Sequence, residues 1–418
     1  MGAIYRLFGS ETSPYSLKVR SYLRYKKLPF DWVARGYDND EEFNSLAKSQ
    51  ALPMLVSPKG GVAHDSSLIF SAIEAKVNKP FVTPMDNGCA VLAILLEEYA
   101  DEWLNKVMTH YRWSAAKTAK AAAKRQAELI FDGYTVEGMA DIEKSIAKTM
   151  TGNLKTIGVV KKNIPILEAS FERFLKLLNA HLEHHLCIFG GNPSRADFAL
   201  AGQLTQMMAE DIPGKLIRET APFVAAWCEF MEEPRSDGPF KALDAVSETL
   251  LPLIRDEVAP TYIAWAVENA LSISKKKKTV TVKIDDAEFK QNVQAQTSAA
   301  FADLLAAFAA TPATEGLTAL LSEAGLAETL PLGAAVEEKN PEPAAEETPA
   351  EETASEDTSE VVTVEADVVE EPAAETEAVT TEDESAPAEE TTEETPAPET
   401  EEGEETTAEE AGIASKDA

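Results

Sequence analysis

The stretch from residue 4 to residue 20 limits the fold of this chain more than any other. An apolar run at residues 4–8 is followed by a loop of small polar residues and then by Pro14. Proline suits the first turn of a helix, because its missing N–H needs no partner there and its φ is already helical. The stretch therefore predicts a strand, a loop and a helix. It places the Ser13 hydroxyl at a helix N-terminus, where unpaired backbone N–H groups and the helix dipole favour an anion.

An anionic sulfur suits this position. A thiol has an unperturbed pKa of about 8.5 and is mostly protonated at neutral pH. Lowering that pKa by one unit requires about 1.4 kcal/mol of extra stabilisation of the thiolate, and a hydroxyl donor at a helix terminus can supply about one to two units. Ser13 is therefore a candidate for activating a thiol. The alternative is a simple helix cap, since serine before proline is a common N-cap, and Ser10 and Thr12 are then the remaining donors of the loop.

Three more short strands are expected nearby. Residues 30–33 form the second strand, which pairs parallel to the first in a strand–helix–strand unit. Leu52 and Pro53 lead into a third strand, because a central strand tolerates proline only at its start. A turn at residues 58–61 returns the chain as a fourth strand. An α/β domain is thus predicted for residues 1–80.

Three motifs in this domain resemble the glutathione transferase superfamily. Residues 13–20, Ser-Pro-Tyr-Ser-Leu-Lys-Val-Arg, resemble the start of the first helix in its serine-type, thioredoxin-like N-terminal domain. The Leu52-Pro53 pair matches the place of the cis proline of that fold. The Asp65-Ser66 pair matches the acidic residue and serine that open its third helix. The resemblance covers about residues 3–235.

The resemblance implies a glutathione site. By this match Ser13 lowers the pKa of the glutathione thiol, and Asp65 and Ser66 hold the γ-glutamyl end by pairing with its ammonium and donating to its carboxylate. The backbone of Leu52, ahead of a cis Pro53, would pair with the cysteinyl part as an added strand does. Glutathione would serve as a co-substrate.

Residues 86–240 are predicted to form an all-helical domain like the C-terminal domain of the same superfamily. Apolar residues recur three and four positions apart between residues 91 and 108. In that family the equivalent helix lines the pocket for the electrophile. The resemblance therefore makes candidates of Tyr99, Trp103, His110, Tyr111 and Trp113. A role in core packing is the alternative, because most aromatic side chains at helical spacing belong to the core.

Two further patterns in this domain favour structural roles. Ser194 and Asp197 stand three apart ahead of an apolar run, which predicts a capping box. His181, His184 and His185 include two histidines one turn apart that could share an ion, but no further ligand follows at a suitable spacing. Histidines at a helix end usually face solvent or the helix dipole. We therefore expect no metal.

Residues 241–330 extend beyond this pair of domains as a small α+β segment of unassigned role. The pattern predicts short helices and an alternating strand at residues 279–284, with a partner at residues 287–293. A run of four lysines precedes that strand. Without interleaved aromatic residues it is weak support for nucleic-acid binding, which we do not expect.

The remainder of the chain differs in composition. Residues 331–418 contain 31 Asp and Glu against two Lys, a charge of −29, so the preceding 330 residues carry only −5 of the total of −34. They contain no Phe, Trp or Tyr. Such a segment cannot bury enough apolar surface to offset the entropy lost on ordering. We predict a disordered acidic tail that acts as a spacer. A solubilising segment, an attractant for a basic partner and a cation sponge are alternatives.

Cysteine usage and hydropathy indicate the compartment. Cys89, Cys187 and Cys228 are far apart and form no CxxC motif, as expected of reduced core residues. No basic region with an apolar core precedes residue 4, and no run reaches the roughly 18 apolar residues of a membrane span. We expect a cytoplasmic protein without membrane contact.

Two functions from different classes follow. The first is a glutathione transferase active in detoxification, in which Ser13 activates the thiol for attack on a small electrophile; an isomerase or dehalogenase would share the thiol site. The second is a non-catalytic binding or scaffold protein of the same fold with an acidic interaction tail. The resemblance implies a homodimer in either case.

Overall fold

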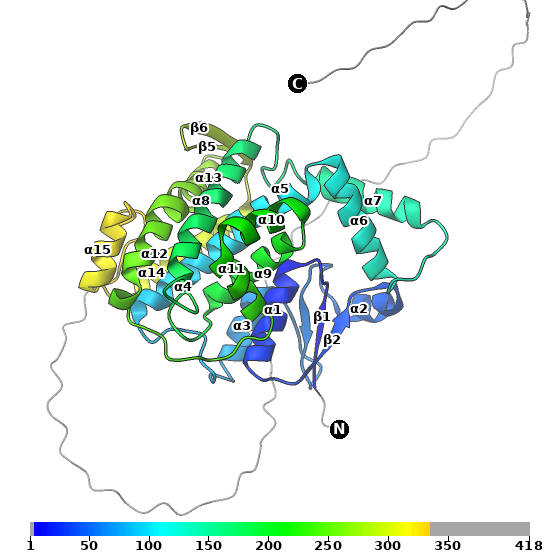
Figure 1. Cartoon of the computed structure of the whole chain (residues 1–418), viewed down its shortest axis with the longest axis horizontal. Coiled ribbons are helices and arrows are strands. Elements are labelled where there is room, and N and C mark those ends of the chain that lie inside the picture. The colour runs from blue at the N-terminus through cyan, green and yellow to red at the C-terminus, as the bar shows by residue number, and fades with distance from the viewer. Residues whose placement is uncertain (1–3, 335–418) are drawn as a thin grey trace, which may run out of the picture. The chain divides into compact units, whose positions relative to one another are not determined.

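A computed structural model describes residues 4–334 (Figure 1). It begins with a four-stranded sheet in the order β2-β1-β3-β4, in which β1 and β2 run parallel and the other neighbours run antiparallel. The elements of this thioredoxin-like domain are β1 (Tyr5–Gly9), α1 (Pro14–Tyr25), β2 (Phe30–Ala34), η1 (Tyr37–Asn39), α2 (Asp40–Leu46), β3 (Met54–Val56), β4 (Val62–His64) and α3 (Ser66–Glu74). The predicted parallel pair and the predicted cis Leu52–Pro53 bond are confirmed.

The alternation of side chains along the strands decides which helix covers which face of the sheet. Leu7 and Leu55 are paired neighbours, and both join the core that contains residues of α1 and α3. The next pair, Phe8 and Met54, packs with Phe43 of α2. A period of two residues is expected of a sheet that is covered on both faces. The sheet therefore carries α1 and α3 together on one side.

An all-helical domain follows, as predicted. Its elements are α4 (Asn87–Glu98), the π-helix η2 (Tyr99–Leu104), α5 (Asn105–Trp113), α6 (Ala116–Ile130), α7 (Met139–Gly152), α8 (Ile164–Leu182), α9 (Arg195–Met208), α10 (Asp211–Thr220) and α11 (Pro222–Phe230). Gly202 lets α9 approach α1 closely, because a Cβ at this position would lie 2.6 Å from the carbonyl oxygen of Pro14. The helical domain is thereby held against the start of α1.

The extension packs onto this helical domain. Its elements are η3 (Leu243–Ala245), α12 (Ser247–Leu253), the π-helix η4 (Ile254–Ile263), α13 (Ala264–Ser274), β5 (Thr279–Ile284), β6 (Ala287–Asn292), α14 (Ala295–Ala310) and α15 (Glu315–Glu323). The predicted hairpin is confirmed by the antiparallel pairing of β5 with β6. Glu257 of η4 is fully buried and accepts hydrogen bonds from Tyr99 Oη at 3.0 Å and Arg173 Nε at 2.7 Å. One apolar core runs from β1 into the extension.

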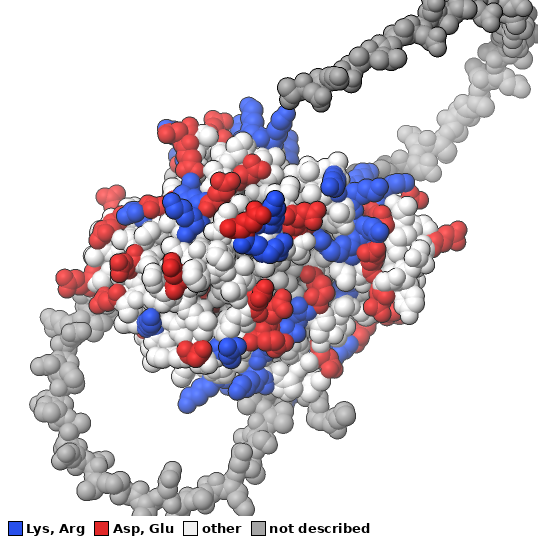
Figure 2. Space-filling model, in the orientation of Figure 1, with Lys and Arg blue, Asp and Glu red and all other residues white. Residues whose placement is uncertain are grey.

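Acidic and basic side chains are interspersed on the face shown in Figure 2. The predicted disordered tail starts at residue 331, and everything after residue 334 lies outside the described residues. The last described residues are packed, since the Gly333 N–H donates to the Thr311 carbonyl at 2.9 Å. Among residues 4–334, none of the helices combines the length and the apolar composition that crossing a bilayer requires.

Candidate functional site

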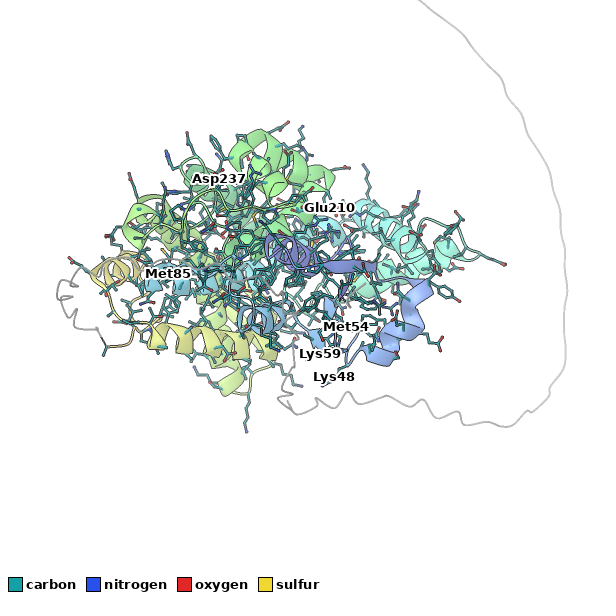
Figure 3. The ribbon with its side chains drawn as sticks, turned by 90° about the horizontal axis from the view of Figure 1, so that it is seen from below. Lys48, Met54, Lys59, Met85, Glu210 and Asp237 are labelled. Carbon is teal, nitrogen blue, oxygen red and sulfur yellow. The ribbon has the colours of Figure 1, made fainter. Side chains whose placement is uncertain are left out.

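The register of the sheet brings three chain segments to one edge. Met54, labelled in Figure 3, lies opposite Phe8 on one side and opposite His64 on the other. The loop after β1, the Leu52–Pro53 bond before β3 and the Asp65–Ser66 pair after β4 therefore leave adjacent strands at the same edge. Neighbouring strands are about 4.8 Å apart. The motifs that sequence analysis singled out thus lie close together in space.

Ser13 caps the first helix and keeps its proton free. Its Oγ accepts a hydrogen bond from the Ser16 N–H at 3.2 Å, and the side chain is half-buried. Within residues 4–334 its hydroxyl proton has no acceptor. The other two hydroxyls of the loop, Ser10 and Thr12, bond to each other at 3.0 Å. Capping occupies an oxygen lone pair and leaves the O–H available, so the cap and the donor interpretations of Ser13 are compatible.

The start of α3 supplies a second helix N-terminus at the same edge. Asp65 has a φ of 73°, and its Oδ1 accepts from the N–H groups of Ser67 at 2.8 Å and Leu68 at 3.1 Å. Ser66 is buried, and its hydroxyl is without a partner in the described part of the chain. The Asp65 carboxylate is exposed. An exposed carboxylate beside a free hydroxyl and a helix N-terminus can hold an amino acid zwitterion.

A buried ion cluster joins the two helices beneath this edge. Lys18 of α1 is 1% exposed, and its Nζ lies 2.7 Å from Glu97 Oε1 and 2.7 Å from Asp101 Oδ2. Ser67 of α3 donates to the same Glu97 oxygen at 2.9 Å. Burial lowers the pKa of Lys18, but the two carboxylates outweigh it and raise the pKa to about 12. Lys18 is therefore a permanent cation that fixes α1, α3 and α4 to one another.

The structure turns most of the predicted pocket residues toward α8 and the extension. Tyr99 Oη donates to Glu257, as described above, and Trp103 Nε1 donates to Ser170 Oγ at 2.9 Å. Both side chains are fully buried. None of these contacts involves the loop that carries Ser13.

The other three candidates also contact helices of their own domain. His110 Nε2 lies 3.1 Å from Glu168 Oε1, and the Tyr111 ring lies 5.6 Å from the ring of Phe171, both on α8. Trp113 packs with alanines of α6. Burial lowers the pKa of His110, although the neighbouring Glu168 raises it in part. Their contacts favour the packing alternative, and their part in a pocket stays a prediction.

The helices α4, η2 and α5 follow one another without a break, and we call them the rod. A stripe of this rod other than the one with the aromatic candidates faces the N-terminal domain. Tyr15 Oη donates to the carbonyl of Asp101 at 2.9 Å, and Arg112 Nη1 donates to the carbonyl of Thr12 at 2.8 Å. Asn105 and Met108 lie between Asp101 and Arg112 in the sequence, at spacings of four, three and four residues. Sequence reasoning missed these residues because it followed the aromatic side chains. The signal was the spacing of Asp101, Asn105, Met108 and Arg112 itself.

His181 of α8 serves the fold. His181 is fully buried, and its two ring nitrogens pair with Thr249 Oγ1 and the Ile188 carbonyl, each at 2.8 Å. Burial lowers its pKa to about 4, so the ring is neutral. Residues 4–334 contain no group of three His, Cys, Asp or Glu side chains placed to hold a metal ion.

Comparison with known families agrees with the fold. Residues 7–81 match the family described as glutathione S-transferase, N-terminal domain, and residues 137–230 match glutathione S-transferase, C-terminal domain. These matches support the assignment of both segments to the glutathione S-transferase superfamily. No curated protein is similar to the chain at the level that this comparison requires.

Solved structures match part of the chain at low sequence identity and low TM-score. A glutathione S-transferase from Methylobacterium radiotolerans, in complex with glutathione sulfonate, is 21% identical over 55% of this chain and 90% of its own, with a TM-score of 0.35. The beta-etherase LigF from Sphingobium is 16% identical over 59% of this chain and 98% of its own, with a TM-score of 0.39. A glutathione S-transferase from Methylobacillus flagellatus with bound glutathione is 19% identical over 59% of this chain and 98% of its own, with a TM-score of 0.33.

Proposed function

We propose that this protein binds glutathione at the edge of the sheet and activates its thiol for transfer to an electrophile. The observation that carries the proposal is the convergence of two helix N-termini, those of α1 and α3, with the free hydroxyl of Ser13. Each terminus attracts negative charge. A tripeptide with a carboxylate at its γ-glutamyl end and a thiolate in its centre matches that pair of sites.

The γ-glutamyl end and the cysteinyl centre of the ligand each have a partner in this arrangement. Asp65 pairs with the α-ammonium of the γ-glutamyl group, and the Ser66 hydroxyl and N–H donate to its carboxylate. The Leu52 backbone pairs with the cysteinyl part, and the Ser13 O–H donates to the sulfur. The hydroxyl and the α1 terminus stabilise the thiolate relative to the thiol, which raises the concentration of the nucleophile at neutral pH.

The transfer step needs no covalent intermediate with the protein. The thiolate attacks the electrophilic atom, a carbon–sulfur bond forms, and the leaving group departs with its electron pair. The protein contributes orientation and thiolate stabilisation. We place the electrophile against the stripe that contains Asn105 and Met108, because this side of the rod faces the loop of Ser13. A homodimer in the cytoplasm, as the resemblance implies, belongs to the same proposal.

Replacing Ser13 tests the proposal. Ser13→Ala should lower turnover of a generic aryl halide by at least about ten-fold, a barrier increase of about 1.4 kcal/mol, while binding to glutathione resin is retained. Thr314→Ala is the matched control, because Thr314 caps α15 through the Leu317 N–H at 3.3 Å and lies in the extension. Equal turnover in the wild type and Ser13→Ala would exclude Ser13 as the activator.

A second candidate function is supported by the packed aromatic side chains. Tyr99 and Trp103 are committed to the core, which removes two of the residues expected to hold an electrophile. A binding or scaffold protein that kept the fold without the chemistry would show this arrangement. A titration separates the two functions: absence of glutathione binding at millimolar concentration favours the scaffold, whereas binding together with turnover favours the transferase.

A further inference from the structure

Two carbonyl groups of the loop before Ser13 accept hydrogen bonds from the helical domain. Within the loop, the Ser13 N–H donates to the Ser10 carbonyl at 3.0 Å. The carbonyl of Glu11 accepts from Gln206 Nε2 at 2.7 Å, and the carbonyl of Thr12 accepts from Arg112 Nη1 at 2.8 Å. In the described part of the chain, no group of the N-terminal domain bonds to these two carbonyls. The peptide groups that set the direction of Ser13 are therefore held from outside their own domain.

Arg112 is the centre of this arrangement and is itself held on three sides. It is 3% exposed. Its Nε donates to Glu210 Oε1 at 2.6 Å and its Nη2 donates to Gln206 Oε1 at 2.5 Å, in addition to the bond to Thr12. Figure 3 labels Glu210, which is the N-cap of α10. A planar guanidinium with three fixed partners has one orientation, so the carbonyl that it binds has one position.

We call Arg112 and Gln206, which bind the Thr12 and Glu11 carbonyls, the clamp. The charge balance around Arg112 favours a rigid clamp. A buried cation is costly unless its charge is balanced, and Glu210, which is 7% exposed, supplies the balance. Arg125 Nη2 lies 2.5 Å from the same Glu210 oxygen but, within residues 4–334, makes no hydrogen bond to the loop, and 35% of its side chain is exposed. The two arginines thus share a carboxylate and differ in whether they contact the loop.

We propose that Arg112 is a positioning residue for Ser13. It fixes the Thr12 carbonyl, together with Gln206 on the Glu11 carbonyl, so that the Ser13 O–H points to the thiol. This inference rests on the proposed function, because it concerns the same thiol site. Thiol activation in the N-terminal domain then requires the helical domain to be in contact with the loop.

The clamp predicts a pH signature that a purely structural role does not. If Arg112 acts through Ser13, its replacement raises the pKa of the bound thiol, so the rate is lost at low pH and recovers where the thiolate forms unaided. Arg112→Lys keeps the positive charge beside Glu210 but loses the planar guanidinium, whose N–H groups bind several partners at once. We expect kcat/KM to fall by at least about ten-fold below the thiol pKa and by less than about two-fold above it. At a pH below the thiol pKa of the wild-type complex, where both proteins bind the protonated thiol, glutathione affinity should change by less than about two-fold.

Further variants separate an effect on the loop from an effect on Glu210. Arg125→Lys perturbs the same Glu210 without touching the loop and should leave the pH profile unchanged. Gln206→Met removes the bond to the Glu11 carbonyl and also the Oε1 acceptor of Arg112 Nη2, while the bond from Arg112 to Glu210 is left in place. It serves if Arg112→Lys folds poorly, and it should shift the profile in the same direction. Adding Arg112→Lys to Ser13→Ala should cost nothing further, because both changes remove the same donor.

An experiment without glutathione keeps this inference separate from the proposed function. Exchange of the Ser13 and Ser16 amide protons should be faster in Arg112→Lys than in Arg125→Lys, since loosening the loop opens both bonds. Faster exchange together with no glutathione binding by the wild type would overturn the proposed function and support the clamp. Equal exchange, or a pH profile that Arg112→Lys does not shift although glutathione binds, would overturn the clamp alone.

Discussion

Within residues 4–334, two helices, α1 and α9, have a serine as their N-cap, and they use it differently. Ser194 at the start of α9 is fully buried, and both its N–H, at 2.8 Å, and its Oγ, at 2.7 Å, donate to Asp197 Oδ2. Ser13 at the start of α1 is half-buried and accepts from the Ser16 N–H, with its proton unused. The third helical residue makes the difference, because Asp197 is an acceptor for the serine and Ser16 is not. A serine cap whose own helix offers no acceptor is available to a ligand.

The largest expected effect lies on the structural side of this comparison. Asp197→Ala removes the acceptor of the Ile188 N–H as well as both bonds from Ser194, and each buried donor left without a partner costs about 1–3 kcal/mol. We expect the free energy of unfolding to fall by about 3–5 kcal/mol in urea denaturation. Ser16→Ala is the matched change on α1. It should be nearly neutral, because the buried Ser16 Oγ has no partner. Similar losses in both variants would break the comparison.

The second effect concerns pH. Burial raises the pKa of Asp197 from 3.8 to about 6, although hydrogen bonds from Ser194 and Ile188 lower it in part. The folded protein therefore holds the proton more tightly than the unfolded chain. This contribution to stability is fully present below about pH 3.8 and is lost as the pH rises through about 6. Between these limits the stability of the wild type should fall by about 3 kcal/mol relative to Asp197→Asn. Parallel pH curves for the two proteins would contradict the assignment.

The smallest effect on stability sharpens the contrast between the two serines. Ser194→Ala should cost about 1–2 kcal/mol of stability and leave glutathione turnover intact. Ser13→Ala should cost at most about 1 kcal/mol, because a cap on a partly exposed helix start is all that is lost from the fold. When the two variants are measured side by side, Ser194→Ala should be the less stable protein. Ser13→Ala should be the one with the lower turnover. The same ranking in both assays would show that both serines only cap helices.

Local patterns in the sequence predicted much of the N-terminal domain. Pro14 and Pro53 fixed a helix start and a strand start, and the Ser194–Asp197 spacing identified the capping box. These features depend on neighbours within a few residues, where residue type limits the backbone directly. The placement of Ser13 near Asp65 required only that the strands pair in register.

Long-range packing was beyond such patterns. Trp103 and His110 were expected at a pocket, but their partners Ser170 and Glu168 come from a helix about 60 residues later in the chain. No sequence pattern assigned a role to Arg112. Only the approach of α9 to α1 shows that its guanidinium is buried against the loop. Which face of a long helix meets which neighbour is decided by tertiary packing.

The pKa of the thiol of bound glutathione tests the central claim most directly. It can be followed by the ultraviolet absorbance of the thiolate as the complex is titrated, in the wild type and in Ser13→Ala. A donor at a helix terminus should lower the thiol pKa of the wild-type complex by about one to two units, and the variant should lose at least about one unit of that shift. Identical thiol pKa values in the two complexes would contradict the account.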